Sequence, residues 1–243
     1  MGDDLLLPVA SCSIGIAGAH FGDRPPVKQK RHPEPKPDGR NARSQRSREA
    51  VVRALLAFVR EGHARPSATE IAGRAKVSRR VVFNQFENME QLRAICLARI
   101  AQEENARFWR PVPTGLALPE RIDAFVRART ARLEFITPYR QASLELAALS
   151  PRITEAVRAG ATRAHAEVKA VFDPEIRQLA PTHRGRLARL LIAACSWPMW
   201  NFLRQDLNLS QGRARQDMSA MIAAAIEREL KVQGEVMIVV PVK

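Results

Sequence analysis

The segment from Ser67 to Leu92 constrains the fold more than any other part of the chain, because it contains three helix-start signals at short intervals. Ser67, with Glu70 three residues later, forms a capping-box pattern. Ser78 and Asn88 are further N-cap residues, each followed by apolar residues at helical spacing. The intervals leave room for two short helices joined by a tight turn and followed directly by a third. They predict a helix-turn-helix, whose second helix enters the major groove of DNA.

The rest of the chain also has helical patterns. Before the motif, apolar residues recur along 42–61, and Gly62 provides a stop signal. Beyond Pro111 and Pro113, Pro, Ser and Thr signals delimit further helices at 119–137, 138–149, 152–172, 184–204 and 210–230. An apolar, β-branched run appears only at 236–242. These patterns predict an all-α fold.

We expect four segments along the chain. A disordered basic arm spans 1–43, and a three-helix domain with the helix-turn-helix spans 44–100. A larger helical domain for effector binding and dimerisation follows over 101–232, and 233–243 forms a C-terminal tail. Five prolines at 25–37 make a helix or a central strand impossible in the arm.

The charge of the chain is concentrated just before the motif. The 243 residues carry a formal net charge of +14, and residues 24–53 hold ten basic side chains against three acidic ones. Such an excess favours a polyanionic partner, which can be DNA, RNA or an acidic membrane surface. Charge alone does not choose among them.

Other classes of site find little support in the sequence. The three cysteines are far apart and the five histidines are scattered, so neither a disulfide framework, a metal site nor a cofactor is expected. The apolar run at 5–19 follows two aspartates and contains Pro8, unlike a signal peptide, and is too short to span a bilayer. We interpret it as a disordered extension of a cytoplasmic, nucleoid-associated protein with no membrane partner.

The second helix of the motif carries the candidate base contacts. Arg79 and Arg80 lie in its first turn, where arginine can donate to both guanine O6 and N7, at about 1–3 kcal/mol of discrimination for a good pair. Val81 suits a thymine methyl, and Asn84 lies one turn further along. The remaining candidate DNA contacts, mostly to phosphate, are Arg43, Arg46, Arg48, Ser67, Thr69, Lys76, Ser78, Phe83 and Asn88. The alternative for each is ordinary capping or a solvated surface.

The order and spacing of several short motifs resemble the N-terminal domain of the TetR family of transcriptional repressors over residues 44–100. The matching segments are 58–62, 69–72, 75–78, 82–86 and 90–92. The segments 200–204 and 207–210 also resemble the end of the family's penultimate helix and its last loop. The chain departs from the family at three positions. Lys76 replaces the usual Gly, Phe83 the usual Tyr, and Met89 the usual Lys.

The resemblance implies a homodimer that binds a palindromic double-stranded DNA operator, with an interface formed by the helices near 184–204 and 210–230. It also implies a pocket for an unknown small-molecule effector between the central helices. Candidate lining residues are Phe108, Trp109, Phe125, Phe135, Tyr139, Trp197 and Trp200. Arg129, Arg132 and Arg140 are candidates to receive an acidic ligand, although surface solvation is the simpler interpretation for each.

Two other classes of function remain open. One is an effector-independent or architectural DNA-binding protein, and the other is an all-α adaptor that uses the basic arm on a membrane surface. An enzyme is not expected, because the sequence contains no Gly-rich phosphate loop, no H-E-x-x-H, no G-x-S-x-G and no constellation of paired acids that would suit general acid–base catalysis.

Overall fold

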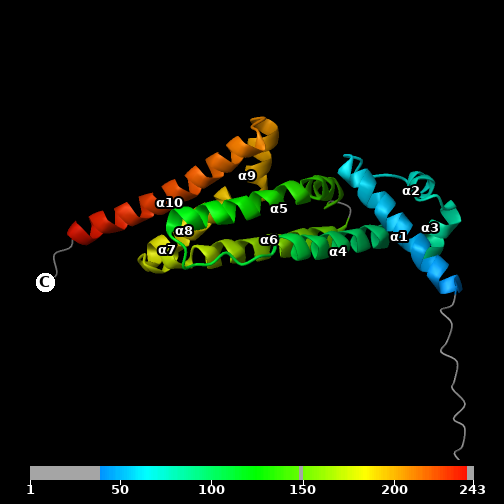
Figure 1. The fold of residues 1–243 in the computed structure, drawn as a ribbon, viewed down its shortest axis with the longest axis horizontal. Helices are drawn as coiled ribbons and strands as arrows, with labels where there is room; N and C mark the ends of the chain where they lie inside the picture. Colours follow the sequence, from blue (N-terminus) through cyan, green and yellow to red (C-terminus); the bar gives the residue numbers. More distant parts are fainter. Residues whose placement is uncertain (1–38, 148–149, 240–243) are drawn as a thin grey trace, which may run out of the picture. The chain divides into compact units, whose positions relative to one another are not determined.

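The computed structural model describes residues 39–147 and 150–239, and side chains up to residue 232. Every element in these ranges is helical, which confirms the all-α fold (Figure 1). The elements are α1 (Gly39–Arg60), α2 (Ala68–Ala75), α3 (Arg79–Gln85), α4 (Met89–Phe108), α5 (Leu118–Ala147), α6 (Pro151–Val171), α7 (Asp173–Arg177), α8 (Pro181–Ala194), α9 (Trp197–Asn201), the π-helical turn η1 (Phe202–Asp206) and α10 (Gln211–Val239).

The first four helices share one hydrophobic core. The inner face of α1 contributes apolar side chains of which Val51 and Leu55 are almost fully buried. Ile71 of α2, Val82 of α3 and Leu92 of α4 pack against it. These are inward-facing positions that the periodic pattern predicts, so hydrophobic burial holds the two short helices against α1 although neither would be stable alone.

The later helices share a second core, in which α5 packs against α6 and α10, and α8 also packs against α6 and α10. The inner side of α10 is a single line of buried apolar residues at intervals of four. Its members are Ala214, Met218, Ile222 and Ile226. Phe125 and Phe172 meet edge to face at 5.3 Å between ring centroids, which is a favourable geometry for two aromatic quadrupoles.

Helix α5 is continuous through Pro138, whereas the sequence predicts a break there. Proline removes one backbone donor, and its ring crowds the carbonyl four residues earlier. The helix continues because its neighbours hold both sides of this point. Tyr139 lies in the core of the first four helices, and Trp197 donates a hydrogen bond of 3.1 Å to Thr137.

The predicted helix at 184–204 is divided into α8, α9 and η1. Ser196 ends the continuity by acting as an N-cap, with its side chain accepting from the backbone N–H of Met199 at 3.3 Å. Pro198 therefore lies in the first turn of α9, where its missing N–H has no cost, and does not kink a longer helix.

The ends of the described chain also differ from expectation. Helix α1 begins at Gly39, so residues 39–43, predicted to lie in the basic arm, are helical. Helix α10 extends to Val239 instead of ending near Leu230, so most of the predicted tail is helical too. The rest of the arm and of the apolar C-terminal run lies outside the described residues. Within the described ranges, no helix is long and apolar enough to cross a membrane.

Candidate nucleic-acid interface and ligand cavity

All three predicted helix caps are present. Ser67 and Glu70 form a reciprocal capping box, with bonds of 2.8 and 3.2 Å between each backbone N–H and the other side chain. This bonding lowers the pKa of Glu70, because the hydrogen bond from Ser67 favours the ionised carboxyl. Ser78 accepts from Val81 at 3.3 Å, and Asn88 accepts from Gln91 at 2.8 Å. The caps fix where α2, α3 and α4 begin.

The turn between α2 and α3 depends on Lys76. This residue has φ 54° and ψ 42°, the left-handed conformation that glycine adopts most easily. Its backbone N–H closes the end of α2 by pointing to the carbonyls of Ala72 and Gly73. A non-glycine residue therefore adopts the left-handed conformation in this turn, and the Lys76 side chain is exposed.

The predicted base-contacting residues lie together on the outer side of α3. Arg79, Arg80 and Asn84 are exposed, and Val81 is partly buried. Among the described residues, neither arginine pairs with an acidic side chain. Arg79 lies over the ring of Phe83 at 5.4 Å, and 46% of Phe83 is exposed. A basic surface with an exposed aromatic ring is suited to contact the base edges and the sugar-phosphate backbone of a nucleic acid.

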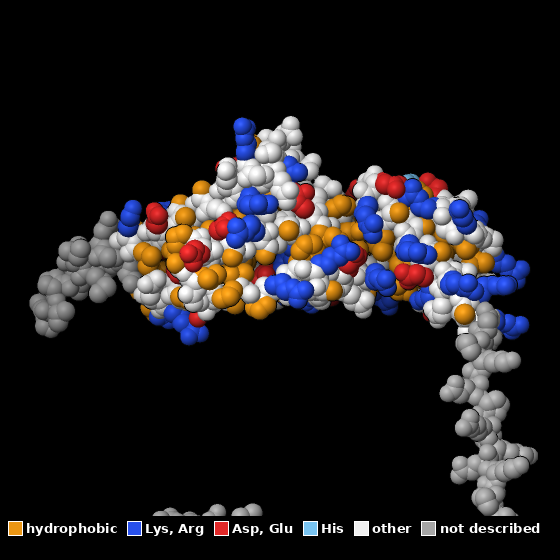
Figure 2. Space-filling model, viewed as in Figure 1, with side chains coloured by type: hydrophobic (Ala, Val, Ile, Leu, Met, Phe, Trp, Pro, Cys, Tyr) orange, Lys and Arg blue, Asp and Glu red, His pale blue; other side chains and the backbone are white. Residues whose placement is uncertain are grey.

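The residues expected near phosphate have more varied surroundings. Arg43, Ser67 and Thr69 are exposed, and Arg46 is exposed with its Nε donating to the carbonyl of Ala42 at 3.3 Å. Arg48 is instead engaged inside the protein. Its Nη1 donates to the carbonyl of Gln85 at 2.6 Å and its guanidinium lies 4.6 Å from the ring centroid of Phe86. Figure 2 shows basic side chains gathered over the α1–α3 part of this face.

A cavity of about 540 Å³ lies between α4, α5, α6 and the start of α9. Its volume is within the range of about 300–1,000 Å³ that small-molecule pockets have. Leu97 and Ile100 from α4, Leu133 and Ile136 from α5, and several small residues from α6 make most of its wall apolar.

Three of the seven predicted lining residues border this cavity, namely Trp109, Tyr139 and Trp197. The others lie elsewhere. Phe125 and Trp200 are fully buried core residues, and the Trp200 indole donates to Glu134 at 3.1 Å. Phe108 and Phe135 pack on each other with ring centroids 5.3 Å apart. Aromatic residues are therefore divided between the cavity wall and the core.

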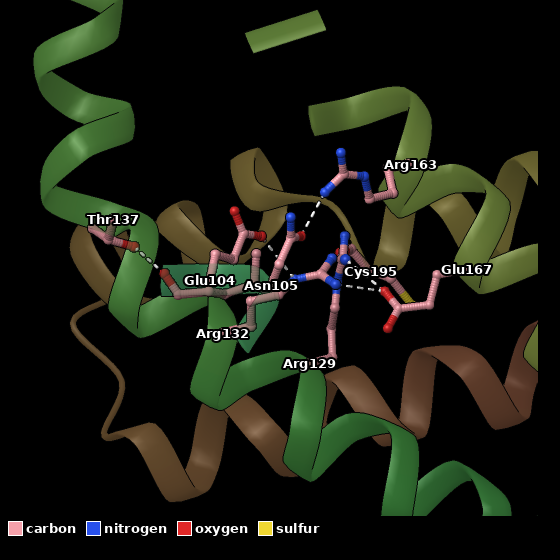
Figure 3. A network of polar contacts seen from close by, with 9 residues as sticks. Glu104, Asn105, Arg129, Arg132, Thr137, Arg163, Glu167 and Cys195 are labelled. Atoms are coloured by element: carbon pink, nitrogen blue, oxygen red, sulfur yellow. Dashed lines mark hydrogen bonds and ion pairs between the residues drawn. The ribbon is translucent and has the colours of Figure 1, made fainter. Parts of the chain in front are cut away.

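Arginines and glutamates form a connected network at the cavity (Figure 3). Glu167 of α6 receives hydrogen bonds from Arg129 at 3.2 Å and from Arg132 at 2.8 Å. Glu104 of α4 lies 3.4 Å from the Nε of Arg132. Burial raises the pKa of both glutamates, although the neighbouring Arg132 opposes that rise. Burial also lowers the pKa of Arg140.

This network is the part of the site that sequence reasoning missed. Arg129 and Arg132 are only 5% and 2% exposed, so the expectation of surface solvation for them is wrong. Glu104 and Glu167 had no assigned role. Glu167 offers a sequence signal, because it lies among alanines and valine on a helix, whereas Glu104 lies among polar residues and offers none. Pairing either acid with a particular arginine requires the tertiary arrangement.

Comparison with known proteins gives a fold likeness. No family model matches the sequence, and no curated protein matches it. A solved transcriptional regulator from Rhodococcus sp. Rha1 is 20% identical with a TM-score of 0.55, covering 74% of this chain and 96% of its own. A protein of Mesorhizobium loti MAFF303099 assigned to the TetR family of transcriptional regulators is 20% identical with a TM-score of 0.59, covering 76% and 97%.

A third structure, a TetR-family transcriptional regulator from Streptomyces coelicolor, is 18% identical with a TM-score of 0.55 and covers 75% of this chain and 81% of its own. The three likenesses establish the architecture, at identities too low to carry residue roles. The chain therefore has the all-α fold of TetR-family transcriptional regulators.

Proposed function

We propose that the protein is a DNA-binding transcriptional regulator, a repressor released by a small-molecule effector, that binds a palindromic operator as a homodimer. The observation that carries the proposal is the start of α3. There Arg79 and Arg80 follow a capped helix start, are exposed, and have no acidic partner among the described residues. Some other exposed arginines do have an acidic partner, as Arg74 has in Glu61.

Specific recognition would come from those two arginines. The first turn of the second helix of such a motif faces base edges, and each guanidinium offers two parallel donors to guanine. Lys76 precedes this turn in the chain, and Arg43 and Arg46 lie on α1; all three are exposed, so they are the candidates for phosphate contacts. Arg48 is not, because its guanidinium is held by the end of α3.

The cavity favours an effector-responsive regulator over an effector-independent one. Helix α4 connects the two functions, because Asn88 caps it beside the motif and Leu97 and Ile100 face the cavity further along. A ligand that moves α4 therefore changes the position of α3. A smaller cavity of about 40 Å³ between α1, α4 and α5 shares Leu97, Ile100 and Tyr139 with the larger one.

The homodimer would use the outer sides of α8 and α10. These helices pack on each other, and part of their outer surface is apolar. Leu190 is 38% exposed, and Ala193, Ala220 and Ala224 are exposed beside partly buried Met221. Small side chains allow close approach of helices from a second copy. Two recognition helices about 34–36 Å apart would then read successive major grooves.

The decisive experiment is selection of duplexes from a random library with the full-length protein. We expect a palindromic consensus whose half-sites lose enrichment when Arg79 or Arg80 is replaced by alanine, at about 1–3 kcal/mol for each lost base contact. Arg158→Ala on the exposed side of α6 is the matched control and should leave the consensus unchanged. Absence of any enriched sequence would contradict the proposal.

Light scattering tests the dimer separately. Without DNA, we expect a particle with twice the mass of one chain. With the selected duplex, we expect the mass of two chains plus that of the DNA. A monomer under both conditions would contradict the arrangement in which two recognition helices bind successive major grooves. DNA binding by a single helix-turn-helix would then still be tested by the selection experiment.

A further inference from the structure

The cavity has an unusual charge balance for an apolar pocket. Five arginines line it, at positions 129, 132, 140, 152 and 163, whereas Glu104 is its single acidic lining residue. Glu167 lies just behind, paired with two of the arginines. Arg152 and Arg163 are exposed, so solvent compensates their charges. Arg129 and Arg132 are buried and Arg140 is partly buried, and a positive charge shielded from solvent is costly unless it has a negative partner.

The two most buried arginines differ in how fully they are bonded. Arg129 is satisfied by the protein, since its Nε and Nη2 both donate to the carbonyl of Cys195 at 2.9 and 2.8 Å. Arg132 is not. Its Nη1 donates to Glu167, but its Nε is buried without a hydrogen-bond acceptor, and Glu104 approaches that atom only to 3.4 Å.

A second unsatisfied donor lies beside it. The indole Nε1 of Trp109 is buried and has no acceptor among the described residues. The guanidinium of Arg132 lies 4.5 Å from the Trp109 ring centroid, and that of Arg163 lies 5.4 Å away. Among the described residues that line the cavity, the two buried side-chain atoms without a hydrogen-bond partner are thus both donors, and their side chains are neighbours. The wall is short of an acceptor, and a bound carboxylate supplies two oxygens.

Arg140 faces the same space from the next turns of α5. Its Nη1 donates to the carbonyl of Val157 at 3.3 Å, and its guanidinium lies 5.6 Å from the Trp197 ring centroid. Burial lowers its pKa, in keeping with a guanidinium partly shielded from solvent, although the charge of Glu104 opposes this shift. An anion between Arg132 and Arg140 would stabilise both charges and would bind with charge-assisted hydrogen bonds.

The remainder of the wall suits an apolar body. Small residues of α6, including Ala156, Ala159 and Gly160, face apolar side chains of α4 and α5. They leave width for a hydrocarbon chain or ring, and they offer no polar group to orient it.

We propose that the cavity binds an apolar carboxylic acid, with its carboxylate held by Arg132, Arg140 and the Trp109 indole and its hydrocarbon part lying between α4 and α6. An apolar carboxylic acid is thus the chemical class of the effector, and its role as an effector rests on the proposed function. Binding itself requires neither DNA nor dimer contacts.

The test is calorimetric titration of the full-length protein, without DNA, using two matched pairs of probes. The pairs are decanoate with decan-1-ol, and 4-phenylbutanoate with 4-phenylbutan-1-ol. At least one acid should saturate a single site per chain, and its alcohol should bind at least about tenfold more weakly, since charge-assisted bonds are lost. Failure of both acids to saturate, or equal binding of acid and alcohol, overturns the assignment.

Variants locate the carboxylate. Arg140→Gln should weaken acid binding about tenfold, and Trp109→Phe should weaken it several-fold because only the N–H donor is removed. Neither should change binding of the alcohol. The control is Arg158→Gln, which lies on the exposed side of α6 and outside the cavity. It should leave binding of both the acid and the alcohol unchanged. Arg140 is chosen for replacement in preference to Arg132, because Arg132 is buried and its replacement could prevent folding. Equal losses in Arg140→Gln and Arg158→Gln would also overturn the proposal.

Duplex selection in a separate experiment distinguishes the two claims. An enriched consensus without acid binding would refute the carboxylate site and leave the regulator intact. Specific acid binding without any consensus would support the site and refute the regulator.

Discussion

The Nε of Arg60 donates a hydrogen bond of 2.6 Å to the hydroxyl of Tyr139. Arg60 is the last residue of α1, and Tyr139 lies on α5 at the wall of the large cavity. The bond therefore joins the helix that supports the helix-turn-helix to the helix that carries the arginine network. Tyr139 also packs in the core of the first four helices, so this one side chain contacts both regions.

A double-mutant cycle should detect this link. We expect Arg60→Met and Tyr139→Phe to be coupled by about 0.5–1.5 kcal/mol in the free energy of unfolding, because either change removes the same hydrogen bond. Urea unfolding of the parent, the single variants and the double variant measures the coupling. Purely additive effects would show that the bond contributes nothing in solution.

Replacing Lys76 by glycine should stabilise the protein. A non-glycine residue in the left-handed region costs roughly 1–2 kcal/mol, and the greater freedom of glycine in the unfolded chain offsets part of that cost. We therefore expect the urea midpoint to rise by an amount equivalent to about 0.5–1 kcal/mol. Lys76→Ala is the matched control, which removes the charge but keeps the strain. If Lys76→Ala stabilises equally, the charge and not the backbone is responsible.

The buried pair of Arg121 and Glu175 should be essential for stability. It joins α5 to α7 with both side chains almost fully buried, and Arg121 also donates to the carbonyls of Thr114 and Leu116. Glu175→Ala leaves the buried guanidinium without its carboxylate and should cost about 3–5 kcal/mol. The control is Arg177→Ala on the same helix, where an exposed pair with Asp173 should contribute at most about 1 kcal/mol. Similar losses in both variants would contradict the prediction.

The buried thiols should be chemically inert in the folded protein. Burial, with a smaller effect of Glu49, raises the pKa of Cys96 to about 12, and burial also raises the pKa of Cys195. Since the thiolate is the reactive form, a Cys12→Ser variant should react with a disulfide reagent at pH 8 very slowly when native. Two thiols per chain should react rapidly once the protein is unfolded. Fast reaction in native buffer would show that one of these sites opens readily.

The helix-turn-helix could be predicted because its determinants are local. Each cap and its partner lie within three residues, as in Ser67 with Glu70, so backbone chemistry fixes the helix starts. The local sequence around a proline does not determine its structural effect. The same residue type lies within α5 at Pro138 but in the first turn of α9 at Pro198, and only the surrounding packing and the Ser196 cap decide between these outcomes.

The polar part of the cavity could not be predicted because it depends on long-range pairing. Arg132 meets Glu167 across 35 positions of sequence, and nothing near either residue indicates the other. Aromatic content is also a poor guide to a cavity. Trp197 and Trp200 lie one helical turn apart, yet Trp197 borders the cavity and Trp200 is a core residue.

The position of Pro138 has a mechanical consequence for α5. Proline has no N–H to donate to the carbonyl of Glu134, so α5 lacks one backbone hydrogen bond there. A helix bends most easily where a backbone hydrogen bond is missing. This point of α5 lies between Arg132 at the cavity and Tyr139 beside α1. Under the proposed function, a change in the bend of α5 at Pro138 would connect ligand binding in the cavity to displacement of the Arg60 end of α1.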